Sequence, residues 1–392
     1  MTSAPTHEQS LAIRLAALSV GQVVSWGILY YALIVAAPMI ADDTGWTLSS
    51  ITLAFSAGLL VSAGSGILVG RRLDRRGPRL VMSVGAVIGT AGLVIVSAAP
   101  NLVVFTAGWV VCGFGQSAVL YQAAFTVITR RHGNRRRRAM TIVTLAGGFA
   151  STIFAPIVAG MLTVLDWRGA FLILAAALLV VTLPLHWFFL ERSWEPPTPP
   201  RAEENVHGVA GVIRTGRFWL LELSMLSLSV ALLSVTLAII PLYMEKGLTY
   251  ELAAWALGLL GAGQVIGRLV YVVVPHTTAP WIPLAATSGS AVVLLCLMAL
   301  VPGPPWLLLA IGVAAGAARG AQTLVQGSAV ADRWGTRNYG SINGVFAAPI
   351  TAVAALGPSL GPIVANGVGG YETMALVMAG VALVSFAVAR LS

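Results

Sequence analysis

The sequence predicts an all-α protein that crosses a membrane many times. Apolar segments long enough to span a bilayer follow one another along almost the whole chain, and the polar breaks between them are short. The composition agrees, because 57% of the 392 residues are hydrophobic and 9% are charged, whereas soluble domains carry about 25% charged residues. The uneven distribution of basic residues then predicts which way the segments run.

A hydropathy window of about 19 residues finds twelve such segments. In chain order they are residues 12–40, 47–70, 80–99, 102–129, 139–164, 168–190, 218–244, 251–274, 280–301, 305–331, 340–366 and 371–390. Glu191–Gly216 is rich in proline and charge and separates two sets of six. We therefore expect two pseudo-symmetric six-helix bundles, at 1–190 and 217–392, joined by a cytoplasmic linker at 191–216.

The first segment is expected to be a retained membrane helix. Met1–Ser10 is polar and lacks the basic region of a signal peptide, and the apolar run after it continues to about Ile40. The predicted protein is thus multi-pass, in the inner (cytoplasmic) membrane of the cell.

Basic residues predict the orientation. Of the 23 Lys and Arg residues, Arg168 and Lys246 alone fall in loops on one face, and Arg268 and Arg319 fall inside apolar segments; the rest share the opposite face. The positive-inside rule therefore places both termini in the cytoplasm. The same rule accounts for the net charge of +9, so no nucleic-acid partner is expected.

A short basic pattern repeats on the predicted cytoplasmic face. Arg-x-Gly-x-Arg occurs at Arg75–Arg79, Arg131–Arg135 and Arg333–Arg337, and the last two follow the fourth helix of their respective halves. Parallel repeats of this kind are typical of transporters built from two six-helix halves.

The break after the second helix, Gly70–Arg79, resembles the signature loop of the major facilitator superfamily, Gly-x-x-x-Asp-Arg-x-Gly-x-Arg. Asp166–Phe171, at the start of the sixth helix, resembles the family's Gly-Trp-Arg-x-x-Phe. The resemblance implies the major facilitator fold. Within the superfamily the chain is most similar to the monocarboxylate transporters and oxalate/formate antiporters, in Ser25–Gly27, in Gly45-Trp46 and in the eighth helix. There the family's Asp-x-x-x-Arg is replaced by Gln264-x-x-x-Arg268, which puts carboxylate-mediated proton coupling in doubt.

The signature loop also has its own physical interpretation. Asp74 can cap a neighbouring helix N-terminus or pair with arginines, and glycines permit a tight turn. The resemblance implies a gating network that closes the cytoplasmic side; the alternative is a basic loop that serves orientation alone. The residues of this gating loop are Gly70, Asp74, Arg75, Gly77 and Arg79.

Arg319 and Arg268 are the strongest indication of chemistry. A charge near the bilayer centre costs at least about 2.5–3.5 kcal/mol on insertion scales and is found mainly facing a cavity, a partner or a ligand. Arg319 heads a stripe on one helical face, and Arg268 belongs to a second stripe. The stripes are Arg319, Gln322, Thr323 and Gln326, and Gln264, Arg268 and Tyr271.

The two arginines are not expected to be equivalent. Arg319 is near the middle of its helix, whereas Arg268 is expected nearer the cytoplasm. Arg319 could instead hydrogen-bond backbone carbonyls, and Arg268 could reach the lipid headgroups. Gly312, Gly316 and Gly320 form a small-residue ridge suited to close helix packing.

Aromatic candidates dominate the first half. Trp26 and Tyr30 lie with Gln22 along the first helix, and Tyr121 lies with Ser117 and Phe125 along the fourth. The resemblance implies that helices 1, 4, 7 and 10 line a central cavity, so an aromatic wall would face a basic one. Helix 7 offers a milder stripe of Ser224, Ser227 and Ser234, while Glu222 is expected to meet a loop arginine.

Together these features predict a secondary transporter for a small organic anion, a monocarboxylate being the leading candidate, that works by alternating access. Arginine suits this substrate because its planar fork can donate two hydrogen bonds to a carboxylate. Both proton symport and anion exchange are compatible with these features. The expected partners are the anion, protons in the case of symport, and membrane lipid, and the protein is expected to be a monomer. The alternative is an efflux transporter for drugs or other hydrophobic compounds, although Ala155-Pro156 only partly matches the exporters' Gly-Pro-rich motif. The scattered histidines predict neither an enzyme nor a metal or cofactor site.

Overall fold

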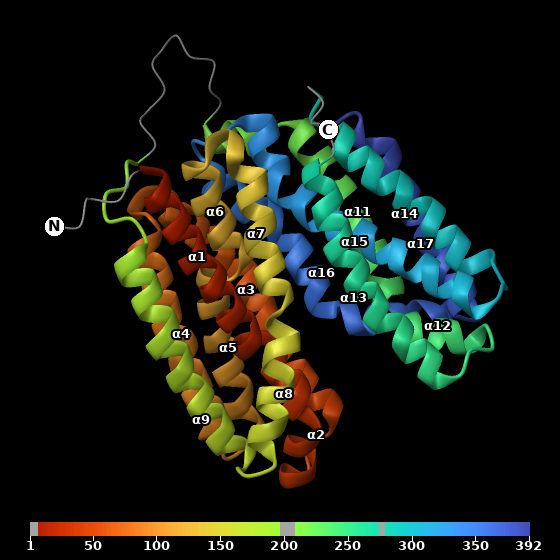
Figure 1. The fold of residues 1–392 in the computed structure, drawn as a ribbon, viewed down its shortest axis with the longest axis horizontal. Coiled ribbons are helices and arrows are strands. Elements are labelled where there is room, and N and C mark those ends of the chain that lie inside the picture. Colours follow the sequence, from red (N-terminus) through yellow and green to blue (C-terminus); the bar gives the residue numbers. More distant parts are fainter. Residues whose placement is uncertain (1–6, 197–207, 274–278) are drawn as a thin grey trace. The chain divides into compact units, whose positions relative to one another are not determined.

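The computed structural model describes residues 7–196, 208–273 and 279–392, which contain helices and no β-strand (Figure 1). Residues 197–207 of the predicted linker and residues 274–278 after Val273 lie outside these described residues. The prediction of twelve membrane helices is confirmed: twelve helical segments are long and apolar enough to cross a bilayer. They are Ser10–Thr44, Leu48–Arg76, Pro78–Ser97, Leu102–Arg131, Gly133–Leu162, Trp167–Phe189, Gly216–Leu237, Tyr250–Val273, Ile282–Leu300, Pro305–Trp334, Tyr339–Gly357 and Tyr371–Ala389.

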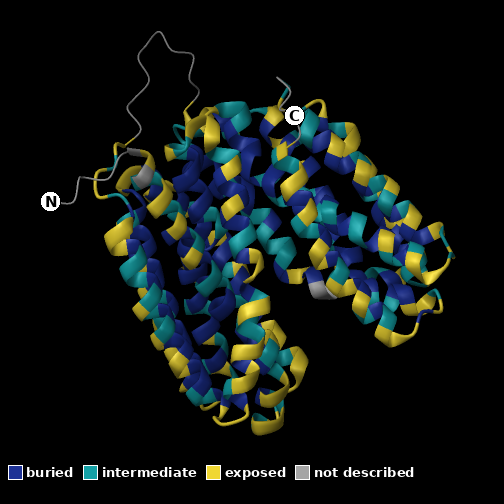
Figure 2. Ribbon diagram, in the orientation of Figure 1, coloured by how far each residue is buried: buried dark blue, intermediate teal, exposed yellow. Residues whose placement is uncertain are grey.

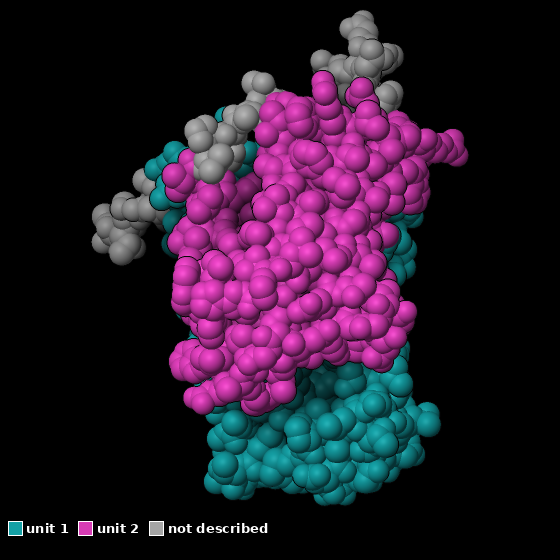
Figure 3. All heavy atoms as spheres, turned by 90° about the vertical axis from the view of Figure 1, so that its right-hand side faces the viewer, with its two compact units in different colours: residues 1–206, 335–351 teal, residues 207–334, 352–392 magenta. Residues whose placement is uncertain are grey.

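The chain divides into two compact units, coloured in Figure 3. Unit 1 comprises Met1–Val206 and Gly335–Thr351, and unit 2 comprises His207–Trp334 and Ala352–Ser392. The predicted second half ran without interruption from 217 to 392. In the structure, residues 335–351 belong instead to unit 1, so the division differs from that expectation at one segment.

Unit 1 holds the first six membrane segments. Its elements are α1 (His7–Trp26), η1 (Gly27–Tyr31), α2 (Ala32–Thr44), α3 (Leu48–Arg76), α4 (Pro78–Ser97), α5 (Leu102–Val119), α6 (Tyr121–Arg131), η2 (Gly133–Arg135), α7 (Arg136–Gly148), α8 (Ala150–Leu162), α9 (Trp167–Ala177), η3 (Leu178–Thr182) and η4 (Leu185–Phe189). Unit 2 contains α10 (Val209–Ile213), α11 (Gly216–Leu237), α12 (Ile239–Glu245), α13 (Tyr250–Val273), α14 (Ile282–Leu300), α15 (Pro305–Trp334) and α17 (Tyr371–Ala389). The helix α16 (Tyr339–Val368) begins in unit 1 and ends in unit 2.

Local sequence signals account for several helix ends. Thr47, Asn101, Asp166 and Thr215 each accept a backbone N–H of the helix that follows, as N-cap residues do. The three Arg-x-Gly-x-Arg repeats share one role at the opposite end of a helix, because each glycine has a positive φ: 77° at Gly77, 45° at Gly133 and 77° at Gly335. The repeat is therefore a helix-stop signal as well as a source of positive charge.

Several membrane segments are interrupted within the bilayer span. The first contains the π-helical turn η1, the fourth breaks at Leu120 (ψ −170°), and the seventh breaks at Ala238 between α11 and α12. π-helical turns within α-helices often occur at functional sites. The prediction treated these segments as continuous, because hydropathy averages over such local breaks.

Each unit has buried residues in its interior and exposed residues on its outer helices (Figure 2). In unit 1, Phe105, Trp109, Trp167 and Phe171 form an edge-to-face cluster with ring centroids 6.1–6.4 Å apart. Many large aliphatic side chains are exposed, as expected for surfaces that face lipid.

Candidate functional site

The helices α13 and α15, which carry the two arginines, approach each other through glycines. A Cβ atom on Gly316 would lie 2.1 Å from the Leu260 carbonyl oxygen, and one on Gly320 would lie 2.1 Å from that of Gln264. Gly263 and Gly267 of α13 approach α15 equally closely, at 2.0 and 1.9 Å from backbone oxygens. Gly316 and Gly320 thus have the packing role that their spacing predicts, whereas Gly312 faces the Tyr243 hydroxyl of α12 at 3.3 Å.

This register places the two arginines at nearly the same height in unit 2. Gly267 meets Ala317, and Gln264 meets Gly320, so Arg268 lies level with the turn of α15 that contains Arg319. Any difference in depth between Arg268 and Arg319 is therefore no more than about one helical turn. The expectation that Arg268 lies nearer the cytoplasm stays a prediction.

The polar stripe of α15 faces α11. Arg319 donates from Nη1 to Thr236 Oγ1 at 2.6 Å, and Gln322 donates from Nε2 to Ser229 Oγ at 2.7 Å. Both hydroxyls give their own hydrogens to α11 carbonyls four residues earlier. They are therefore oriented to accept, and they hold the two α15 side chains in place. This contact of Arg319 is with a side-chain hydroxyl, whereas the predicted alternative was a hydrogen bond to backbone carbonyls.

The remaining members of the stripes occupy three environments. Tyr271 exchanges a hydrogen bond with Ser328 at 2.9 Å, linking α13 to α15. It also lines a largely apolar cavity of about 350 Å³ between α13, α14 and α15. Thr323 bonds back to the Arg319 carbonyl oxygen at 3.3 Å, and Gln264 and Gln326 are half-buried. Arg268 is buried, with 7% of its surface exposed.

The predicted serine stripe of α11 is not on this face. Ser224 instead bonds to the carbonyl oxygen of Ser385 at 2.8 Å, and Ser288 bonds to the Ser385 hydroxyl at 2.7 Å. This cluster joins α11 to α14 and α17, so it serves packing within unit 2. The residues that meet α15, Ser229 and Thr236, were missed although their seven-residue spacing places them on one helical face.

In unit 1 the predicted aromatic residues do come together. The Trp26 ring lies 4.9 Å from that of Tyr121 and 5.2 Å from that of Tyr30, and Tyr121 stacks on Phe125 at 5.5 Å. Trp26 directly precedes the π-turn, Tyr30 lies within it, and Tyr121 directly follows the break at Leu120. The aromatic cluster therefore lies where both helices depart from α-helical geometry.

Two glutamines satisfy backbone groups released by these breaks. Gln22 donates to the Val119 carbonyl oxygen at 2.5 Å, and Gln116 donates to the Leu29 carbonyl oxygen at 2.8 Å. Buried carbonyls in a membrane must find a donor inside the protein. The spacing of Gln22 had predicted a place beside the cavity residues. In the structure Gln22 is fully buried and connects the first and fourth segments.

Asp74 of α3 caps the N-terminus of α16. It accepts the backbone N–H of Gly340 at 3.1 Å and of Ser341 at 2.6 Å, together with the Ser341 hydroxyl at 2.7 Å. Arg130 lies 3.6 Å away and completes a nearly buried ion pair. Both sequence-based roles of Asp74, helix cap and arginine partner, are thus present, although Arg130 was not among the predicted residues. Arg130 itself lies over the Trp194 ring at 4.9 Å.

The other gating-loop residues behave differently from one another. Residues 70–76 are the last turns of α3 rather than a loop, because the helix continues beyond the end of the hydrophobic stretch. A Cβ on Gly70 would lie 2.0 Å from the Gly340 carbonyl oxygen, and Gly77 ends the helix with its positive φ beside Trp194. Arg75 is exposed and makes none of Asp74's contacts, while Arg79 lies 4.1 Å over the Trp187 ring.

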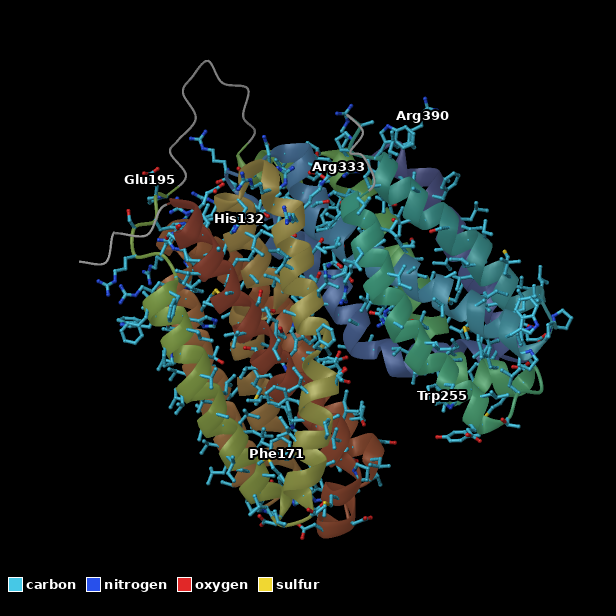
Figure 4. The ribbon with its side chains drawn as sticks, in the orientation of Figure 1. His132, Phe171, Glu195, Trp255, Arg333 and Arg390 are labelled. Atoms are coloured by element: carbon cyan, nitrogen blue, oxygen red, sulfur yellow. The ribbon has the colours of Figure 1, made fainter. Side chains whose placement is uncertain are left out.

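Polar residues around this cap extend the network. Glu191 pairs with both Arg14 and Arg131. His132, labelled in Figure 4 with Glu195, is half-buried between α6 and η2, and desolvation lowers the pKa of its imidazole. Within the described residues no cluster of His, Cys, Asp and Glu could hold a metal ion.

Comparison with known proteins agrees with this architecture. The sequence profile of the Major Facilitator Superfamily matches residues 18–304. Human monocarboxylate transporter 11 is 32% identical over 170 residues, which cover 41% of this chain and 33% of that protein. The multidrug resistance protein MdtL of Klebsiella pneumoniae is 25% identical over 230 residues, which cover 58% of this chain and 57% of that protein. The matched regions therefore span between a third and three fifths of these relatives.

A solved structure extends the likeness to the whole fold. The E. coli fucose:proton symporter FucP superposes with a TM-score of 0.73 at 16% identity, covering 97% of this chain and 99% of that one. The twelve apolar helices, the Asp74 cap and the match over residues 18–304 lead to one conclusion: the chain belongs to the Major Facilitator Superfamily.

Proposed function

We propose that this transporter carries a small organic anion, with a monocarboxylate as the leading candidate, and that Arg319 and Arg268 bind its carboxylate. The observation that carries the proposal is that two arginines lie within about one helical turn of each other in height, on membrane helices that glycines bring into close contact. Two positive charges in a medium of low dielectric constant attract an anion strongly. The similarity to human monocarboxylate transporter 11 over part of the chain supports this substrate class.

The neighbours of Arg319 suit carboxylate binding. Thr236 accepts one N–H of the guanidinium, which holds the planar five-donor group of Arg319 in a defined position between α11 and α15. Gln322, Gln326, Gln264 and Tyr271 supply neutral polar groups on the same two helices. Trp26, Tyr30 and Tyr121 form the aromatic cluster of unit 1 and stay predicted substrate contacts of that unit.

The superfamily's alternating access would present this site to each side of the membrane in turn. We further propose, from the charge distribution, that both termini lie in the cytoplasm and that the protein works as a monomer in the inner membrane. The Asp74 network with Gly70, Gly77 and Arg79 would then stabilise the cytoplasmic end.

Ligand-induced thermal stabilisation of the purified protein tests the substrate class, because a ligand raises the melting temperature according to its occupancy. We expect lactate, pyruvate, oxalate or formate to raise it saturably, and Arg319→Ala and Arg268→Ala to abolish the rise. Arg217→Ala, which removes an exposed charge from the same unit, should respond like the unaltered protein.

Efflux of hydrophobic compounds is the second candidate, because MdtL is similar over 58% of the chain and unit 1 presents an aromatic cluster. Stabilisation by the lipophilic cation tetraphenylphosphonium, with no response to any carboxylate, would support efflux and refute the anion site.

A further inference from the structure

Glu222 is buried in unit 2 without a partner. Its side chain belongs to a residue that is 4% exposed, and neither carboxylate oxygen accepts a hydrogen bond from any described residue. The expected ion pair with a loop arginine is therefore not observed. An ionised carboxylate held in this way costs several kcal/mol, whereas a protonated carboxyl is neutral. Chemistry thus favours a bound proton in this conformation.

Glu222 is the first member, in chain order, of a polar row on α11. Glu222, Ser229 and Thr236 are seven residues apart and share one helical face. Ser229 and Thr236 accept from Gln322 and Arg319 of α15. The first position of the row therefore differs from the other two, because it carries an ionisable group and has no donor.

An aromatic pair lies about one helical turn before Glu222, outside the row. The rings of Phe218 and Trp334 lie 5.9 Å apart and join the beginning of α11 to the end of α15. Phe218 is one turn before Glu222 and is fully buried. Opening the α11–α15 contact at these rings would therefore admit water within about one helical turn of Glu222.

The charged side chains on the segments around Glu222 include none, among the described residues, that hydrogen-bonds it. Arg333, labelled in Figure 4 near the end of α15, donates to the Ala329 carbonyl oxygen and the Ser392 hydroxyl. α14 and α10 contribute no charged side chain, and Glu245 near α12 lies toward the opposite end. The groups nearest in height are Asp332 and Arg333 of α15, Arg390 after α17, Arg214 after α10, and Arg217 of α11 itself.

We propose that Glu222 is the proton-binding site of this transporter and that its proton travels with the anion, a coupling that rests on the proposed anion transport. The proton stays on the carboxyl while the α11–α15 contact is dry and leaves to water when that contact opens. Thr236, which holds Arg319, is fourteen residues along α11, about 21 Å away at 1.5 Å per residue. The anion and the proton therefore bind at separate sites, and movement of α11 against α15 couples them.

Glu222→Gln tests the proposal because it imitates the protonated carboxyl and cannot release a proton. In proteoliposomes the variant should retain counterflow of a labelled carboxylate at equal pH. Accumulation driven by an inward proton gradient should fall by about tenfold or more, within the usual range of coupling between sites. Glu251→Gln, which alters an exposed glutamate of the same unit, should accumulate normally. Normal gradient-driven accumulation by Glu222→Gln, or accumulation in the unaltered protein that ignores the gradient, would overturn the proposal.

An infrared measurement separates this proposal from the identity of the anion. The unaltered protein at neutral pH should show the carbonyl band of a protonated carboxylic acid that Glu222→Gln lacks and Glu222→Asp retains. If no carboxylate undergoes counterflow, the proposed substrate is wrong, yet the band still supports proton binding at Glu222. Absence of the band from the unaltered protein would refute it.

Discussion

At the scale of single residues, the sequence located the charges correctly and their partners less well. Arg319 and Gln322 are anomalous in an apolar helix, so they stand out without a structure. Ser229 and Thr236 do not stand out, because hydroxyls are common in membrane helices and usually bond to their own backbone. Only the relative rotation of α11 and α15 shows that these two hydroxyls, rather than Ser224 and Ser234, meet the stripe.

Thr236→Val tests the support of Arg319. Loss of the hydroxyl removes one charged hydrogen bond and frees the guanidinium. We expect KM for the transported carboxylate to rise about tenfold, equivalent to about 1.5 kcal/mol. Thr287→Val is the matched control, since its hydroxyl bonds to Pro283 of its own helix and its loss should leave KM unchanged. An unchanged KM in Thr236→Val would show that the hydroxyl does not position the arginine.

At the scale of helices, hydropathy predicted the number and positions of the membrane segments but not their interruptions. The turn at Gly27–Tyr31 and the break at Leu120 have apolar neighbours, so their average hydropathy is that of a continuous helix. The same averaging ended the second segment at 70, although α3 continues to Arg76. Glycine spacing was more informative, because Gly316 and Gly320 imply a close helix contact whichever helix supplies it.

Gly320→Ala tests the α13–α15 contact. The added methyl group would meet the Gln264 carbonyl oxygen at 2.1 Å, and overpacking of this kind costs about 1–3 kcal/mol. We expect a lower melting temperature and weaker anion binding, because the heights of the two arginines depend on this contact. Gly261→Ala adds the same methyl group to α13 where nothing lies within 4 Å, and its melting temperature should not fall. Equal melting temperatures for the two variants would contradict the close contact.

Asp74→Asn tests the cap of α16. The amide keeps the shape of the side chain but loses the charge that pairs with Arg130, and its nitrogen cannot accept from Ser341. Charged hydrogen bonds are each worth about 1.5–3 kcal/mol, so a clear loss of thermal stability is expected. Ser341→Ala, which removes one of the three hydrogen-bond donors to Asp74, should lose less stability. Asp42→Asn, at an exposed position near the end of α2, should lose none. If Asp74→Asn has the same melting temperature as the Asp42→Asn control, the cap contributes no stability.

At the scale of the whole molecule, composition and repeats were sufficient for the fold class, and the superfamily match and the twelve membrane helices agree with it. The division of the chain into two units was harder to predict from the sequence. Residues 335–351 follow α15 in sequence, yet Asp74, Arg130 and the glycines of α3 hold them in unit 1. Such contacts join residues more than 200 positions apart, which no local pattern in one sequence reports. The substrate class rests on the two arginines.

Counterflow in proteoliposomes tests that central claim most directly. Vesicles loaded with unlabelled lactate, pyruvate, oxalate or formate would take up the labelled form of the same anion through the unaltered protein. We predict saturable uptake of at least one of the four, and uptake near background for Arg319→Ala and Arg268→Ala, with Arg217→Ala as the active control. Normal uptake by both arginine variants would contradict the anion site.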